Sequence, residues 1–322
     1  MDTINKSMTD PKDFPVFYAT RIEPRLKGLE NQRQKIVLRR RIMLAIFLVI
    51  IAFIPVAFFI NPTAGRFLMI MTAITGSVAF VTGSVMGVGL QNKVKLIMLP
   101  ELAQFVGLKL GSRREKSFSL DMFQSIGILP VGNQQSMGDQ FYGEKDGIRI
   151  DIADALIQQK TKQRSNGKTT TSTTTLFQGP LFRLTFNRPL KSQVTLVKDF
   201  GRLINFMSQR KIPGEPIRLE DIEFENRFEA YGSDQVEARY ILTPYFMQRV
   251  LALSDHSQNL PLAIAFTPGF VYLALNDSVD WFEAGSLSTE LIDQKRATRL
   301  LHQLTFAFKI AEILDLSKET KA

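Results

Sequence analysis

Two long apolar runs near the start of the chain restrict its fold more than any other feature. Residues 42–60 and 67–90 contain no charged side chain, and only a short polar turn, residues 61–66, separates them. As helices the runs would be about 28 Å and about 36 Å long, which is enough to cross the hydrocarbon core of a bilayer. We therefore expect a hairpin of two transmembrane helices.

The excess positive charge lies beside these runs. The net charge is +9, and it is concentrated in residues 1–41 and 92–116, whereas residues 117–322 are nearly neutral. The basic residues at the membrane ends of the runs are Arg39, Arg40, Arg41, Lys93 and Lys95. Lys and Arg are enriched on the cytoplasmic side of membrane helices, so we expect a multi-pass protein of the inner cell membrane with both termini in the cytoplasm. The location of the charge also favours membrane lipids over nucleic acid as the partner of the basic flanks.

Small residues recur along the second apolar run. Ala79, Gly83 and Gly87 are spaced four residues apart, which places them along one ridge of a helix. Small residues at this spacing let two helices approach closely in a membrane. We expect this ridge to pack against the first run, and a homo-oligomer formed through the same ridge is the alternative.

The rest of the chain changes from helical to strand periodicity. Apolar and polar residues alternate over residues 148–152 and 182–186, a turn at residues 145–147 favours a hairpin, and Pro268–Gly269 favours a second hairpin. Residues 161–175 are rich in threonine and contain no apolar residue, which predicts an exposed mobile loop or hairpin tip. These patterns predict an α+β fold with a mainly antiparallel sheet.

Helix signals complete the expected organisation. Pro24 argues for a first helix that begins near Arg25, and Asp234 with Glu237 resembles a capping box. The other expected helices are residues 93–110, 120–126, 202–210, part of 219–228, 234–240, 243–253 and 288–314. The expected regions are an N-terminal tail and basic helix (1–41), the transmembrane hairpin (42–90), a juxtamembrane helix and connector (91–116) and a cytoplasmic α+β domain (117–322).

The residues that usually carry chemistry are sparse. Cysteine is absent, which excludes disulfides and thiolate chemistry, and His256 and His302 have no partner at a metal-ligand spacing. No glycine pattern of a nucleotide-binding loop or hydrolase is complete. We therefore predict no catalytic residue, no cofactor and no metal. One polar cluster, Asp234, Glu237, Arg239 and Tyr240, is a candidate interaction or anion site, although helix capping explains its two carboxylates equally well.

The segment around this cluster resembles a known family. The residues concerned are Leu219-Glu220-Asp221, Phe224-Glu225, Phe228, the run Asp234-Gln235-Val236-Glu237-Ala238-Arg239-Tyr240, Leu242-Thr243-Pro244 and Phe246-Met247. They resemble the bacterial DUF3137 family, a domain of unknown function. The resemblance implies two membrane spans and a cytoplasmic α+β domain, and it implies no activity, substrate or catalytic residue.

These observations favour a membrane-tethered cytoplasmic interaction domain, an adaptor or scaffold with a protein partner. Two alternatives remain open at this point. One is an enzyme that acts on a lipid or membrane-adjacent substrate, which the polar cluster near Asp234 would serve. The other is a homo-oligomer that organises the membrane through the ridge of small residues.

Overall fold

A computed structural model describes residues 11–111, 119–165, 168–198, 212–283, 285, 287 and 289–316, except for the side chains of residues 11, 78–86, 165 and 168. The helix expected over residues 202–210 lies outside these ranges. The described chain divides into two compact units, which are treated separately below: residues 11–102 with 283–299, and residues 103–282 with 300–316.

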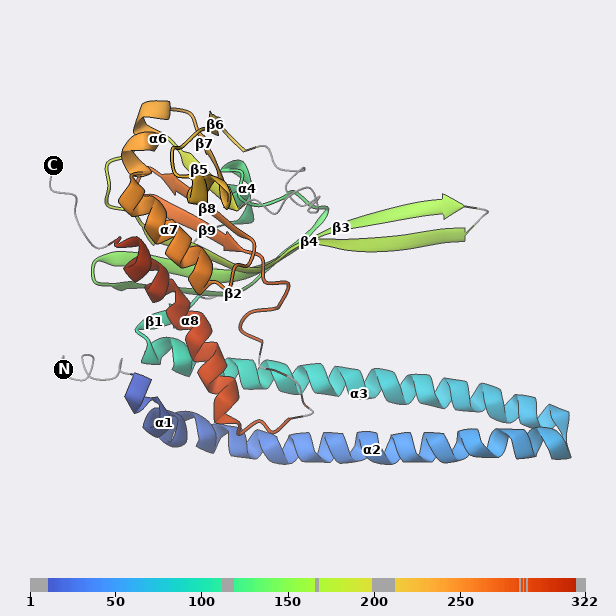
Figure 1. Cartoon of the computed structure of the whole chain (residues 1–322). Coiled ribbons are helices and arrows are strands. Elements are labelled where there is room, and N and C mark those ends of the chain that lie inside the picture. Colours follow the sequence, from blue (N-terminus) through green and yellow to red (C-terminus); the bar gives the residue numbers. More distant parts are fainter. Residues whose placement is uncertain are drawn as a thin grey trace. The chain divides into compact units, whose positions relative to one another are not determined.

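The first unit is built on two long helices (Figure 1). They are α2 (Glu23–Ile60) and α3 (Pro62–Phe105), and α2 is preceded by η1 (Pro11–Asp13), α1 (Phe14–Phe17) and the π-helical turn η2 (Tyr18–Ile22). The expected helix start near Arg25 is wrong, because helical structure already begins at Pro11. Pro24 is the second residue of α2 and directly follows the π-helical turn η2, so the wider turn occurs where the proline interrupts the regular helix.

Close contacts hold α2 and α3 side by side. A Cβ atom added at Gly76 would lie 2.7 Å from Cε2 of Phe47, so the ring packs closely on α3 at a position where glycine has no side chain. At the turn, the side chain of Asn61 accepts the backbone N–H of Thr63 at 2.9 Å. The helical stretch Phe14–Ile60 is long and apolar enough to cross a membrane, and its most apolar part is not buried in the protein. That α3 crosses as well stays a prediction.

The second unit contains one large antiparallel sheet, which confirms the expected α+β class. In the described part of the chain its nine strands have the order β1-β2-β3-β4-β9-β8-β5-β7-β6. Their bounds are β1 (Leu108–Leu110), β2 (Gln134–Lys145), β3 (Ile148–Ser165), β4 (Lys168–Thr185), β5 (Val194–Lys198), β6 (Glu215–Ile217), β7 (Phe228–Gly232), β8 (Leu262–Thr267) and β9 (Phe270–Leu275). The strand β1 replaces the end of the helix expected over residues 93–110.

The hairpins form where the turn residues predicted them. Asp146 and Gly147, with φ of 52° and 75°, connect β2 to β3, and both values suit a two-residue hairpin turn. Of the expected loop or hairpin tip at residues 161–175, residues 161–165 belong to β3 and residues 168–175 to β4, and these strands are paired, which agrees with the hairpin alternative; residues 166 and 167 lie outside the described set. These two strands extend well beyond the neighbouring strands of the sheet (Figure 1).

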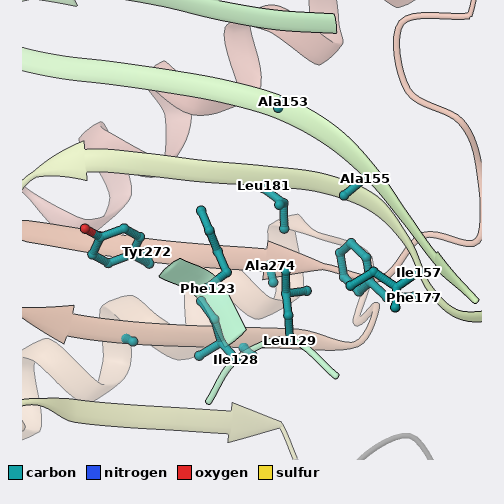
Figure 2. Packing of buried hydrophobic residues seen from close by; sticks show 12 residues of the cluster. Phe123, Ile128, Leu129, Ala153, Ala155, Ile157, Phe177, Leu181, Tyr272 and Ala274 are labelled. Atoms are coloured by element: carbon teal, nitrogen blue, oxygen red, sulfur yellow. The ribbon is translucent and has the colours of Figure 1, made fainter. Parts of the chain in front are cut away.

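Helices cover both faces of this sheet. On one face Phe123 of α4 (Leu120–Ser125) meets Tyr272 edge-on at 5.3 Å between ring centroids, within a cluster that includes Ile157 and Phe177 (Figure 2). On the other face Phe246 of α7 (Pro244–His256) packs on Phe266 at 5.3 Å between ring centroids. This double cover explains why consecutive residues of β5 and β8 are buried.

The remaining helices are α5 (Ile222–Glu225), α6 (Gln235–Ile241) and α8 (Gln294–Leu314). Of these, α5 and α8 are shorter than their sequence patterns indicated, whereas α6 agrees with its predicted range within one residue. The predicted cap of α7 is confirmed, because Oγ1 of Thr243 accepts the N–H of Phe246 at 3.3 Å. The helix α8 starts six residues later than expected, because the residues before it bind the long helices of the first unit, as described next.

Candidate functional site

The sequence-predicted cluster lies at the start of α6. Asp234 caps this helix, since Oδ1 accepts the N–H groups of Val236 at 2.8 Å and of Glu237 at 3.1 Å. The reciprocal part of the capping box is wrong, because the carboxylate of Glu237 binds elsewhere. It accepts the N–H groups of Lys191 and Ser192, each at 2.7 Å, and the Ser192 hydroxyl. These hydrogen bonds, chiefly that of the hydroxyl, lower the pKa of Glu237.

The other two members of the cluster face solvent. Arg239 is exposed, and Tyr240 keeps 59% of its accessible surface. Asp234 and Glu237 therefore fix a helix end and the chain before β5, while Arg239 and Tyr240 are exposed on the surface of α6. The interaction or anion site at this cluster stays a prediction.

A different region brings distant parts of the sequence together. We use "docking segment" for the described residues 283, 285, 287 and 289–293, which precede α8. Within the first unit this segment contacts both long helices. On α3, Nε2 of Gln91 donates to the carbonyl of Gly285 at 2.9 Å, and Nζ of Lys95 lies 3.9 Å from Oε2 of Glu283. Sequence patterns indicated none of these contacts.

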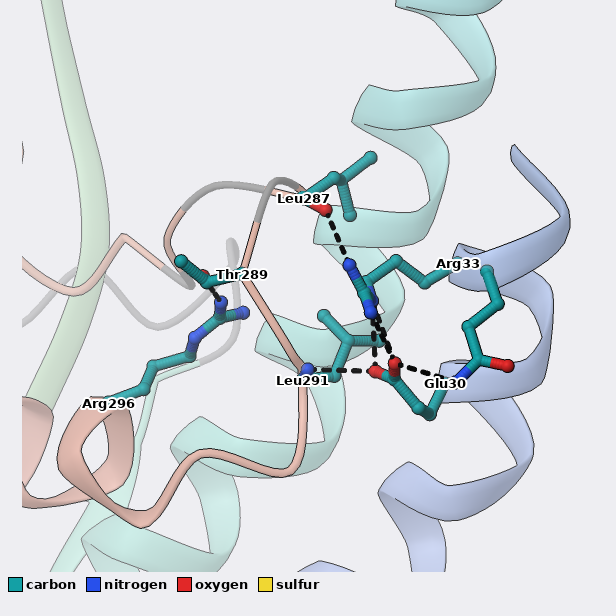
Figure 3. Close-up of polar contacts among 7 residues, drawn as sticks. Glu30, Arg33, Leu287, Thr289, Leu291 and Arg296 are labelled. Atoms are coloured by element: carbon teal, nitrogen blue, oxygen red, sulfur yellow. Dashed lines mark hydrogen bonds and ion pairs between the residues drawn. The ribbon is translucent and has the colours of Figure 1, made fainter. Parts of the chain in front are cut away.

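A buried ion pair connects the segment to α2 (Figure 3). Glu30 and Arg33 have side chains only 9% and 10% exposed, and their carboxylate and guanidinium meet at 2.6 Å. Each also binds the docking segment: Nη1 of Arg33 donates to the carbonyl of Leu287 at 3.0 Å, and Oε2 of Glu30 accepts the N–H of Leu291 at 2.8 Å. Burial alone would raise the pKa of Glu30, but the hydrogen bonds from Arg33 and Leu291 outweigh it and lower this pKa.

The ridge of small residues contacts the same segment. A Cβ atom added at Gly87 would lie 3.1 Å from Cδ1 of Leu287, so glycine lets this leucine approach α3. The side chains of Ala79 and Gly83 lie outside the described set, and packing through the full ridge stays a prediction. Of the predicted basic flanks, Arg39, Arg40, Arg41 and Lys93 are exposed, whereas Lys95 is half-buried beside Glu283.

A cavity of about 640 Å³ lies between α2 and the docking segment. Its lining combines two guanidinium groups, two carboxylates and several apolar side chains. The lining residues are Arg33, Gln34, Val37, Leu38, Arg41, Thr289, Glu290, Ile292 and Asp293. Such a lining can bind a ligand that carries both signs of charge. Within the described residues, no group of three or more His, Asp or Glu side chains could hold a metal ion.

A second buried ion pair supports the sheet of the other unit. Asp151 and Arg183 are directly paired on β3 and β4, and Nε of Arg183 donates to Oδ2 of Asp151 at 2.8 Å. Asp151 is fully buried and Arg183 is 8% exposed. In the sequence both residues alternate with apolar neighbours, a pattern that does not reveal their burial. The signal that could have revealed the pair is the opposite charge at matching positions of two adjacent strands.

Comparison with known proteins concerns the C-terminal part of the chain. No curated protein and no solved structure matches the chain. Residues 175–316 match the model of a family described as "Protein of unknown function (DUF3137)". The match includes α5 to α8 and the docking segment, and it supports the resemblance seen around Asp234 to Met247. The C-terminal part of this chain is thus similar to the DUF3137 family.

Proposed function

We propose that this protein is a membrane-anchored adaptor that recruits a protein partner with an acidic surface to the inner leaflet. The observation that carries the proposal is the extension of β3 and β4 beyond the sheet. We use "arm" for the paired residues 159–164 and 169–174 of these strands. Anchoring would confine the arm to a thin layer, which raises its effective concentration for a partner in that layer.

The arm is ordered by pairing although it has no core of its own. Its strands are in continuous register, with Gln159 opposite Thr174 and Arg164 opposite Thr169. Threonines fill the second strand, and their β-branched side chains favour the extended conformation. At its base, the side-chain amide of Asn133 exchanges two hydrogen bonds with the backbone of Lys160, each at 2.8 Å. A recognition element ordered in this way loses little entropy on binding.

The charge of the arm has one sign and lies on one face. Lys160, Lys162 and Arg164 alternate along β3, so they point to the same side, and the arm contains no acidic residue. Their cross-strand neighbours on that side are Thr173, Thr171 and Thr169. Successive cations are about 7 Å apart, and the hydroxyls between them can donate or accept hydrogen bonds. This pattern fits a row of carboxylates on an extended protein segment.

The proposal includes the topology expected from the apolar runs. In it α2 and α3 both cross the inner membrane, and the sheet unit and both termini lie in the cytoplasm. Because the chain has no cysteine, single cysteines can be introduced at Thr63, in the turn between the helices, and at Thr171 of the arm. In intact cells a membrane-impermeant maleimide should label Thr63→Cys and spare Thr171→Cys. Labelling of both, or of Thr171→Cys alone, contradicts this topology.

The partner can be sought with a photocrosslinking residue placed at Thr171, on the basic face, and at Gln163, on the opposite face. We expect a crosslinked protein from the first position and much less from the second. In a second variant, residues 160–173 are replaced by Asn-Gly, which closes the remaining strands with a two-residue turn while the sheet is retained. This variant should remain in the membrane and lose the partner.

Charge variants test the mechanism of recruitment. Replacing Lys160, Lys162 and Arg164 together by glutamine should reduce crosslinking from Thr171 several-fold, whereas Lys191→Gln, which removes an exposed cation elsewhere in the same unit, should leave it unchanged. In parallel, Arg239→Gln removes an exposed cation from the interaction site predicted on α6 and tests whether that site takes part in partner binding. Equal crosslinking from both faces of the arm, together with partner retention after its replacement, would show that the arm is not the recognition element.

A further inference from the structure

We infer that the cavity between α2 and the docking segment binds the headgroup of a phospholipid that carries a primary ammonium, of the phosphoethanolamine class. The inference rests on the proposed membrane anchoring and adds a specific ligand to it. It uses the first unit alone, and it is independent of the arm.

The location of the cavity along α2 is the first argument. Its wall on this helix runs from Arg33 to Arg41, and the uncharged run begins at the next residue, Ile42. At 1.5 Å per residue, Leu38 lies about 6 Å from the start of that run. The headgroup layer of a bilayer has a similar thickness on each side of the hydrocarbon core. The cavity therefore lies at headgroup depth when the run is in the membrane.

The charges of the lining select the headgroup. Arg41 and Glu290 are both exposed, and among the described residues neither makes an ion pair or a side-chain hydrogen bond. A guanidinium recognises phosphate oxygens through several N–H donors. A carboxylate in the same cavity would repel a purely anionic headgroup but would accept hydrogen bonds from an ammonium, which has three N–H donors. A choline headgroup has no such donor.

The neighbouring groups strengthen this division of charge. Asp293 adds a second carboxylate to the side of Glu290, and one of its oxygens already accepts the N–H of Lys295 at 2.9 Å. Arg33 adds positive charge on the side of α2, although its guanidinium is held by Glu30 and Leu287. Val37 and Leu38 supply apolar surface for the glycerol part and the first methylenes of the lipid. The volume, about 640 Å³, is within the range of small-molecule sites.

The test uses the full-length protein in detergent and measures bound lipid by native mass spectrometry. Phosphatidylethanolamine, phosphatidylcholine and phosphatidylglycerol with identical acyl chains are titrated separately. We expect phosphatidylethanolamine to bind about tenfold more tightly than the other two, the scale of one charge-assisted hydrogen-bonded contact. Equal or tighter binding of phosphatidylglycerol, or equal binding of phosphatidylcholine, overturns the inference.

Two variants assign the roles within the cavity. Arg41→Gln should weaken phosphatidylethanolamine and phosphatidylcholine alike, because both present a phosphate. Glu290→Gln should weaken phosphatidylethanolamine alone and bring it to the level of phosphatidylcholine. The matched controls Lys35→Gln on α2 and Glu312→Gln on α8 change charge outside the lining and should have no effect. Unchanged binding in both cavity variants, with intact melting curves, overturns the site.

Soluble phosphoethanolamine distinguishes the source of the headgroup. If the site takes a membrane lipid, millimolar soluble phosphoethanolamine should compete poorly, because it lacks the acyl chains that the bilayer presents. Effective competition at micromolar concentration would show a soluble-ligand site and overturn the lipid assignment. Failure of the arm experiments leaves this result unaffected, so the two proposals can fail separately.

Discussion

Replacing Arg33 with methionine should release the docking segment from α2. The pair that Arg33 forms with Glu30 is buried, with side chains 10% and 9% exposed, so solvent screens it little. Removing one partner leaves the other charge without compensation, which typically costs about 3–5 kcal/mol. The carbonyl of Leu287 also loses its donor. Since these losses are not additive, we expect the contact to weaken by about 3 kcal/mol.

Hydrogen exchange measured by mass spectrometry on the full-length protein can detect this change. Backbone amides that exchange by local opening report the free energy of that opening. A loss of about 3 kcal/mol should accelerate exchange in peptides covering residues 287–293 by roughly 150-fold, because each 1.36 kcal/mol is a factor of ten. Peptides from β8 and β9, in the other unit, should be unaffected. Arg39→Met, which removes an exposed cation six residues further along α2, provides the matched control.

The double variant Glu30→Gln with Arg33→Met sharpens the test. Glutamine removes the orphan charge and keeps an acceptor for the N–H of Leu291, so the double variant should be protected better than Arg33→Met alone. If exchange in the docking segment changes less than threefold in Arg33→Met, the ion pair does not hold this segment. Acceleration throughout both units would instead indicate global unfolding.

Two further predictions concern the buried carboxylates. The folded state lowers the pKa of Glu30, so this carboxylate stabilises the fold above its unfolded value of 4.5, and the stabilisation is lost as pH falls below that value. The melting temperature of the full-length protein should therefore fall more steeply below pH 4.5 than that of Glu30→Gln. Parallel curves for the two proteins would contradict this prediction. Asp151→Ala should leave the guanidinium of Arg183 buried without its carboxylate and cost about 3 kcal/mol, or roughly 6–12 °C in the melting temperature of the sheet unit. The control Arg149→Gln removes a cation that is 54% exposed and 3.4 Å from Asp151, and it should shift the melting temperature by no more than about 2 °C. A similar shift in both variants would contradict the assignment of the energy to the buried pair.

Local sequence signals predicted much of the fold because the corresponding interactions are local. The turn at Asp146 and Gly147, the cap at Thr243 and the hairpin at Pro268–Gly269 each depend on a few adjacent residues. Strand alternation also predicted the antiparallel sheet. It did not indicate that Asp151 is buried, however, because a period of two identifies two faces and does not show that both are covered.

The contacts around the cavity could not be predicted in the same way. Glu30 and Arg33 are three residues apart on a helix, a spacing that usually marks an exposed ion pair. Their burial depends on Leu287 and Leu291, which are 254 and 261 positions away from their partners along the chain. Glu237 illustrates the same difficulty, since a local capping motif was expected and a loop more than 40 residues earlier binds its carboxylate instead.

The separation between Glu30 and Leu291 also affects how the chain can be made. A ribosome releases the long helices early, and the backbone groups that complete their polar pair emerge only after most of the protein has been synthesised. Until then the carboxylate of Glu30 and the guanidinium of Arg33 lack the contacts from Leu287 and Leu291 and remain accessible to water. A chain that stops before residue 287 therefore cannot form the two backbone hydrogen bonds that complete this buried pair.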